Sequence, residues 1–119
     1  AQIIGIYGSE LNFSLLGGHS HDRYFLIDGN QPTKHHLDSI ESEKGIENID
    51  IVNEYDGFII STIFNEPTDL WRYPVFTVSG SESGLEKVYQ SSVLVPYWKI
   101  DLAPTKQATM EFKIKVKEI

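Results

Sequence analysis

The feature that most constrains the fold is a strict alternation of residue types over eight residues, 110–117, within the C-terminal stretch 109–119. Apolar side chains occupy every second position, and glutamate or lysine side chains stand between them; the apolar members are Met110, Phe112, Ile114 and Val116. A period of two is typical of a β-strand with one face on a hydrophobic core and the other in water. We therefore expect a strand here, against which the rest of the chain pairs.

Short apolar runs bounded by turn residues recur along the whole chain. They predict further strands at 1–8, 11–15, 24–27, 46–55, 58–64, 73–78 and 92–102. The run 58–64 is the most apolar and is expected to be a central, well-buried strand. Asp56-Gly57, directly before it, is the strongest hairpin signal in the sequence.

Between these strands the sequence predicts one short helix and several connections. The helix is expected at 36–45, where Asp38 can cap, Glu41 follows three residues later and Gly45 can end it. Residues 65–70 and 79–84 are expected to be loops, and 85–90 fits a helical turn as well as a strand. Pro96 interrupts the strand at 92–102, which indicates an edge position or a bulge.

Seven to nine short strands at these intervals describe an all-β fold. We expect a single domain over residues 1–119, an antiparallel β-sandwich of the Ig-like or jelly-roll-like Greek-key kind. A small closed β-barrel is the alternative. Parallel α/β units are excluded because no predicted helix is long enough for a crossover connection.

Charge and composition limit the partners. The net charge is −7, and residues 1–86 hold 14 acidic against 4 basic residues, whereas residues 87–119 hold 3 acidic residues against 6 lysines. An acidic body repels phosphate backbones, so no nucleic-acid partner is expected. There is no cysteine, which excludes disulfides and thiolate metal sites. The sequence also contains no apolar run of transmembrane length.

The chain begins with Ala1-Gln2 and carries no basic segment followed by an apolar run, so no signal peptide is seen. We interpret this start as a processed, secreted or cell-surface protein, or as a domain cut from a longer one.

All four histidines lie between positions 19 and 36. His19 and His21 stand two apart and share a face of a strand, so with Asp22 they are the candidate ligands of a Zn²⁺ or Cu²⁺ ion. His35 and His36 are expected to lie elsewhere, and exposed loop histidines are the favoured interpretation. The acidic turns 28–30 and 53–57 offer oxygen atoms to Ca²⁺, although Asx-Gly is also ordinary turn chemistry. No cofactor is expected beyond these options.

Aromatic residues give the more useful functional signal. Trp71, Arg72 and Tyr73 follow a proline-containing loop, and Tyr97 follows Pro96. These residue types anchor protein interfaces and stack on sugar rings, so these four are the candidate binding residues. Of the two tryptophans, Trp98 is expected to be buried and Trp71 partly exposed.

No catalytic arrangement is recognised, because the segment 80–84 does not have the order of a nucleophile elbow and there is no phosphate-binding loop. The sequence therefore favours a non-catalytic recognition or adhesion module that binds a protein or a glycan. Two alternatives stay open: an inhibitor or immunity-type partner of a basic enzyme, and a metal-binding sandwich that uses His19 and His21.

Overall fold

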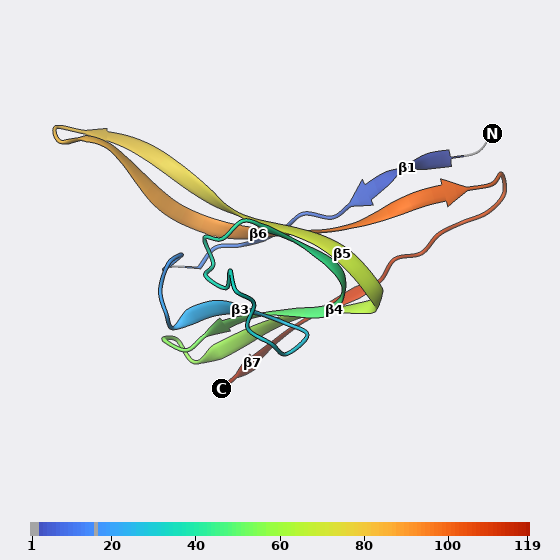
Figure 1. The fold of residues 1–119 in the computed structure, drawn as a ribbon, viewed down its shortest axis with the longest axis horizontal. Coiled ribbons are helices and arrows are strands. Elements are labelled where there is room, and N and C mark those ends of the chain that lie inside the picture. The colour runs from blue at the N-terminus through green and yellow to red at the C-terminus, as the bar shows by residue number, and fades with distance from the viewer. Residues whose placement is uncertain (1–2, 16) are drawn as a thin grey trace.

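The computed structural model describes residues 3–15 and 17–119, and these form one antiparallel sheet of seven strands (Figure 1). The strands are β1 (Ile3–Gly8), β2 (Leu11–Phe13), β3 (Arg23–Ile27), β4 (Glu41–Asn53), β5 (Phe58–Ser81), β6 (Gly84–Leu102) and β7 (Phe112–Glu118). The order across the sheet is β1-β6-β5-β4-β3, with β2 also on β6 and β7 also on β5. The first two residues of the strand predicted at 1–8 lie outside the described part.

The sheet folds over on itself because β4 and β5 each run through both of its halves. Ile46 pairs with Thr68 and Asn48 with Ile63, so four residues of β5 stand opposite Glu47 alone. At this irregularity β5 turns back, as Figure 1 shows. One layer holds β3, β7, the end of β4 and the start of β5. The other holds β1, β2, β6, the start of β4 and the rest of β5.

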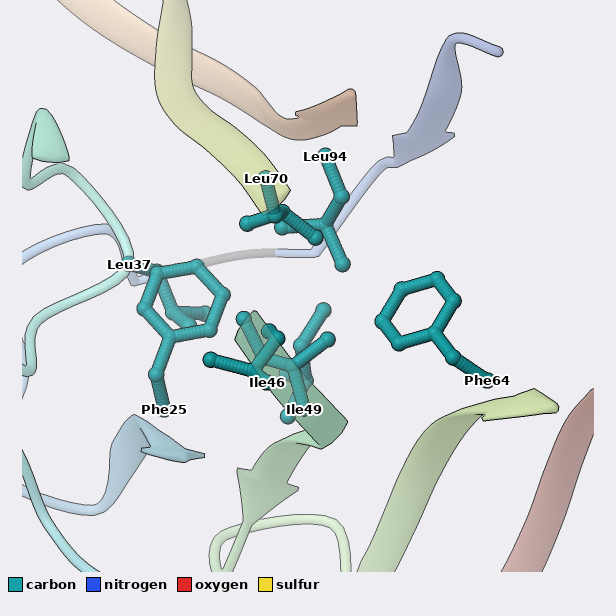
Figure 2. Close-up of a cluster of buried hydrophobic side chains, with 8 residues drawn as sticks. Phe25, Leu37, Ile46, Ile49, Phe64, Leu70 and Leu94 are labelled. Atoms are coloured by element: carbon teal, nitrogen blue, oxygen red, sulfur yellow. The ribbon is translucent and has the colours of Figure 1, made fainter. Parts of the chain in front are cut away.

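The hydrophobic core lies between these two layers. Figure 2 shows Leu70 and Leu94 facing a group contributed by the other layer and by the loop before β4. The buried cluster consists of Phe25, Leu37, Ile46, Ile49, Ile51, Phe64, Leu70 and Leu94. This arrangement confirms the predicted all-β antiparallel sandwich. The sheet stays open, since β1 and β3 are the ends of its strand order, and no closed barrel forms.

The hairpin predicted at Asp56-Gly57 is confirmed. Asn53 pairs with Phe58, and Gly57 adopts a φ of 77°, which a residue with a side chain rarely tolerates. The buried Asn53 side chain accepts the amide hydrogen of Asp56 at 2.9 Å and donates to its carboxylate at 2.9 Å. The turn is therefore fixed by its own side chains.

The helix predicted at 36–45 is wrong. Residues 41–45 are the first part of β4, and the described residues contain no helix. Within that run Glu41 and Glu43 are partly buried whereas Ser42 is exposed, an alternation that belongs to a strand. Asp38 does not cap a helix, because its carboxylate lies 3.0 Å from His19 Nδ1.

Most of the two loops predicted around β5 also belongs to strands, and of the segment 79–84 only residues 82–83 form a turn. Residues 65–70 lie within β5, and Pro67 falls at the bend where pairing with β4 is interrupted. The segment 79–84 is the tip of a long hairpin in which Ser81 pairs with Gly84. This hairpin projects from the sandwich at the upper left of Figure 1. The bulge of β6 lies beside Phe76, whereas Pro96 faces the interruption between β1 and β2.

The strand β7 lies at an edge, paired only with β5. Phe112 packs against the core, but Ile114 and Val116 are exposed, so the expected burial of one whole face is wrong beyond Phe112. The lysines between them are exposed as predicted, where they hinder pairing with further strands. Among the described residues no helix is long and apolar enough to cross a membrane.

Candidate aromatic groove

The exposed face of the second layer carries a shallow groove between the start of β4 and the middle of β5. Its volume is about 450 Å³, and its lining includes Ile40 and Ser42 on one side and Trp71 and Tyr73 on the other. Ser42 is the cross-strand partner of Trp71. Side chains at alternate positions share a face of a strand, which is why Trp71 and Tyr73 both open into this groove.

The indole of Trp71 forms the floor of the groove. Trp71 is 46% exposed. The centroid of its ring lies 4.5 Å from that of the buried Tyr97, and the two ring planes are tilted by 33°. Lys44 Nζ donates to Tyr97 Oη at 2.6 Å and lies 3.7 Å from an Asp69 carboxylate oxygen. The hydrogen bond to Tyr97 raises the pKa of Lys44, so the ammonium stays charged. One face of the indole is thus held while solvent reaches the rest.

Arg72 lies beneath this floor, on the opposite face of β5. Its side chain is fully buried, and it donates to Glu43 Oε1 at 3.1 Å and to the Lys34 carbonyl at 2.6 Å. It also donates to Ser39 Oγ, and its guanidinium lies 4.9 Å from the centre of the Phe25 ring. The structure therefore corrects the expectation that Arg72 contacts a ligand, because strand alternation turns it into the core.

The other predicted binding residues separate in the same way. Trp71 is partly exposed, as predicted, and Tyr73 is half-buried beside it. Tyr97 is 5% exposed and supports Trp71 instead of facing solvent. Trp98, expected in the core, is only half-buried and stacks on Tyr7 at a centroid distance of 6.1 Å. Sequence reasoning missed Ile40 and Ser42, since it placed them in a helix.

A second hollow of about 630 Å³ lies between β5 and the segment leading into β7. Its aromatic members, Phe64 and Phe112, meet edge to face at 6.3 Å and pack on each other. Neither ring is among the exposed large hydrophobic residues. The smaller groove at Trp71 is therefore the better candidate for ligand binding.

Three of the four histidines meet, contrary to the expectation that His35 and His36 lie away from His19. The rings of His19 and His36 stack at 3.9 Å, and those of His35 and His36 at 4.4 Å. The loop before β4 returns along β3 through antiparallel bridges of Tyr24 with His36 and of Ile27 with Asn30. Further along it, Asp38 N is bonded to the Gly18 carbonyl at 2.8 Å. Burial, and then the neighbouring imidazoles, lower the pKa of His36.

The candidate metal ligands are not brought together as a site. His19 lies against Asp38, and Asp22 is 3.9 Å from Arg23. Over residues 3–15 and 17–119 no three histidine, aspartate or glutamate side chains are placed to hold a metal ion. In the acidic turn at 28–30, Asp28 Oδ1 accepts the amide hydrogens of Glu47 and Asn48 at 2.8 and 2.9 Å.

The fold and the groove define an antiparallel β-sandwich domain with an open aromatic surface. Residues 1–114 match the family described as alpha-amylase/4-alpha-glucanotransferase, C-terminal, and the chain belongs to this family. Alpha-amylase 1 of Dictyoglomus thermophilum is 38% identical over 111 residues, which are 92% of this chain and 16% of that protein. The chain thus spans about a sixth of the length of this relative. No solved structure matches the chain. The family makes this a carbohydrate-related domain.

Proposed function

We propose that this chain is a non-catalytic accessory module that binds an α-1,4-glucan chain in the groove at Trp71. The observation that carries the proposal is the half-exposed indole of Trp71, backed by the buried ring of Tyr97 at 4.5 Å. The C–H face of a pyranose packs on such a ring, and a rigid aromatic anchor loses little entropy when a ligand binds. The family and the amylase relative supply the choice of α-glucan.

Glu41, which also lines the groove, is a candidate partner for sugar hydroxyl groups. The amide of Ser42 donates to Glu41 Oε1 at 3.1 Å, and this bond, followed by the charge of Lys34, lowers the pKa of Glu41. Glu41 therefore remains an ionised hydrogen-bond acceptor at neutral and mildly acidic pH. An apolar floor with a few fixed polar groups is the usual composition of a small-molecule site.

The experiment is an isothermal calorimetric titration of the chain with maltoheptaose. We expect binding by the wild-type chain and a loss of at least about thirtyfold in affinity for Trp71→Ala, since a buried aromatic anchor contributes about 2 kcal/mol. Trp98→Phe is the matched control, because it alters the other tryptophan and leaves the groove intact. Cellohexaose, with β-linkages, tests the choice of glucan.

Two results would contradict the proposal. One is the absence of any heat of binding with millimolar maltoheptaose. The other is an affinity of Trp71→Ala equal to that of Trp98→Phe, which would place the ligand elsewhere on the domain.

A further inference from the structure

The wall of the groove opposite Trp71 is the short segment 40–42, and its attachment to the sheet is weak. Only Glu41, Ser42 and Glu43 pair with β5 before the register shifts at the next irregularity of β4. Ile40 lies outside the strand and is 67% exposed. The end of so short a ladder is expected to fray unless another contact holds it.

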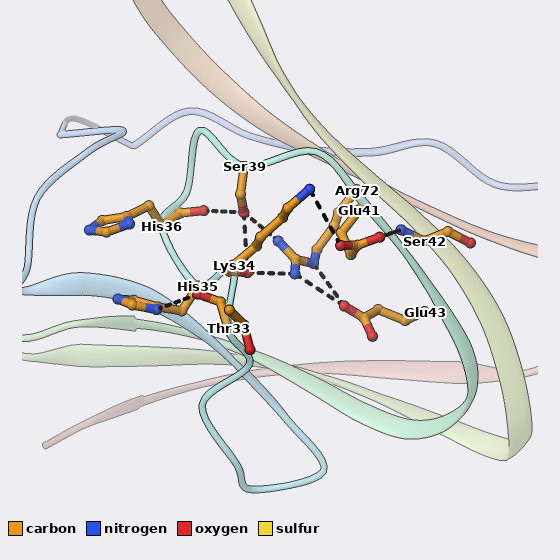
Figure 3. Close-up of polar contacts among 9 residues, drawn as sticks. All are labelled: Thr33, Lys34, His35, His36, Ser39, Glu41, Ser42, Glu43 and Arg72. Carbon is orange, nitrogen blue, oxygen red and sulfur yellow. Dashed lines mark hydrogen bonds and ion pairs between the residues drawn. The ribbon is translucent and has the colours of Figure 1, made fainter.

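That contact is made by Arg72 from below. Figure 3 shows its guanidinium between the loop before β4 and the first residues of the strand β4 itself. It bonds Ser39 Oγ and the Lys34 carbonyl on one side of the wall, and Glu43 Oε1 on the other. The Arg72 side chain therefore bonds the residues on both sides of the segment 40–42, Ser39 and Glu43. Arg72 lies between Trp71 and Tyr73 in sequence. The strand β5 therefore carries both the floor of the groove and the side chain that holds its wall, whose contacts we call the clamp.

Ser39 is the link between the guanidinium and the loop. While it accepts from Arg72, its hydroxyl donates to the His36 carbonyl at 2.6 Å, and its amide bonds the same oxygen at 3.0 Å. Lys34 Nζ adds a contact of 3.8 Å to Glu41 on the exposed side. Each of the three guanidinium nitrogen atoms has a partner, and two of them tie the loop to β5.

We propose that Arg72 is a positioning residue of the groove: its buried guanidinium holds the wall formed by residues 40–42 opposite Trp71, and thereby sets the affinity for the glycan. This inference rests on the proposed function for its ligand and on the contacts of Arg72 for its mechanism. An ordered wall spares the ligand the entropy of fixing it. Arg72 itself touches no ligand.

The experiment compares Arg72→Lys and Ser39→Ala with the wild-type chain by amide hydrogen exchange and by maltoheptaose titration. Lysine keeps the charge near Glu43 but lacks the planar fork that also reaches the loop. Ser39→Ala removes only the link to the loop, which keeps the test usable if the arginine variant does not fold. We expect exchange in residues 34–42 to rise, and affinity to fall, by about tenfold in each variant, the factor that corresponds to roughly 1.4 kcal/mol. Ser39→Thr keeps a hydroxyl and is expected to restore both.

The control is Asn53→Ala, which removes a buried polar side chain from the hairpin between β4 and β5, away from the groove. If exchange at residues 34–42 reported only a general loss of stability, it would rise in Asn53→Ala as much as in Arg72→Lys. If exchange at 34–42 rises equally in Asn53→Ala, or not at all in Arg72→Lys, the positioning role is refuted. If exchange rises but affinity is unchanged, the wall has no part in binding and the inference fails. If the wild-type chain binds no maltoheptaose, the proposed function fails, and exchange alone still decides whether Arg72 holds the wall.

Discussion

Replacing Glu43 with glutamine tests how much the buried ion pair beneath the groove contributes to stability. The Arg72 side chain is 0% exposed and that of Glu43 is 18% exposed, and they are 3.1 Å apart. Removing one partner of a buried pair leaves an uncompensated charge, which costs about 3–5 kcal/mol when both partners are fully buried. Glutamine still accepts one hydrogen bond and water reaches position 43, so we expect a loss of about 2–3 kcal/mol.

The measurement is urea unfolding of the wild-type chain and Glu43→Gln, with a thermal scan beside it. A loss of this size lowers the midpoint temperature by roughly 10 °C in a domain of this length. Glu47→Gln is the matched control, because it makes the same change at an exposed position of the same strand and is expected to stay within about 0.5 kcal/mol. The double variant Arg72→Met with Glu43→Leu should recover part of the stability, since it removes both charges together. Equal unfolding free energies for Glu43→Gln and Glu47→Gln would refute the reasoning.

Two further predictions concern the core and the histidines. Leu94→Ala is expected to lower the unfolding free energy by about 2–5 kcal/mol, because Leu94 is completely buried between the two layers; a urea-measured loss below about 1 kcal/mol would contradict this packing. The lowered pKa of His36 means that the unfolded chain, with a pKa of about 6.5, binds the proton more readily than the folded chain. The contribution of His36 to stability is then fully present above pH 6.5 and declines as the pH falls below it. Urea midpoints at pH 7.5 and 5.5 should therefore differ less in His36→Gln than in the wild-type chain. An unchanged difference in that variant would exclude His36 as the cause.

The period-two patterns predicted most strands, but the length of β5 was hidden by its prolines. Its 24 residues include Pro67 and Pro74, each of which indicates a break on local grounds. The structure tolerates Pro67 at the bend, where pairing with β4 is interrupted. Pro74 lies beyond the last pair between β4 and β5 and pairs with Ser92 of β6, so β4 requires no amide hydrogen from position 74. Only the tertiary arrangement shows that both positions are harmless.

The candidate site was half visible in the sequence. Trp71 and Tyr73 were recognised by residue type, and alternation alone would have turned Arg72 to the other face. The wall at Ile40 and Ser42 was lost because Asp38 and Glu41 imitate the capping pattern of a helix. The strand at this position is supported by a partner 29 residues further along the chain, since Glu43 accepts a hydrogen bond from Arg72. Local propensity carries no record of such a contact.

The two layers of this sandwich share strands β4 and β5, and this has a consequence for how the domain comes apart. Where separate sheets are joined by loops, one sheet can open while the other persists. Here the loss of either layer removes the pairing partners of a strand that continues into the other. Opening is therefore expected to be cooperative over the whole molecule, with the slowest-exchanging amides of both layers reporting one common free energy. The hairpin tip around 81–84 lies far from the shared bend, and its amides are expected to exchange independently of this common opening.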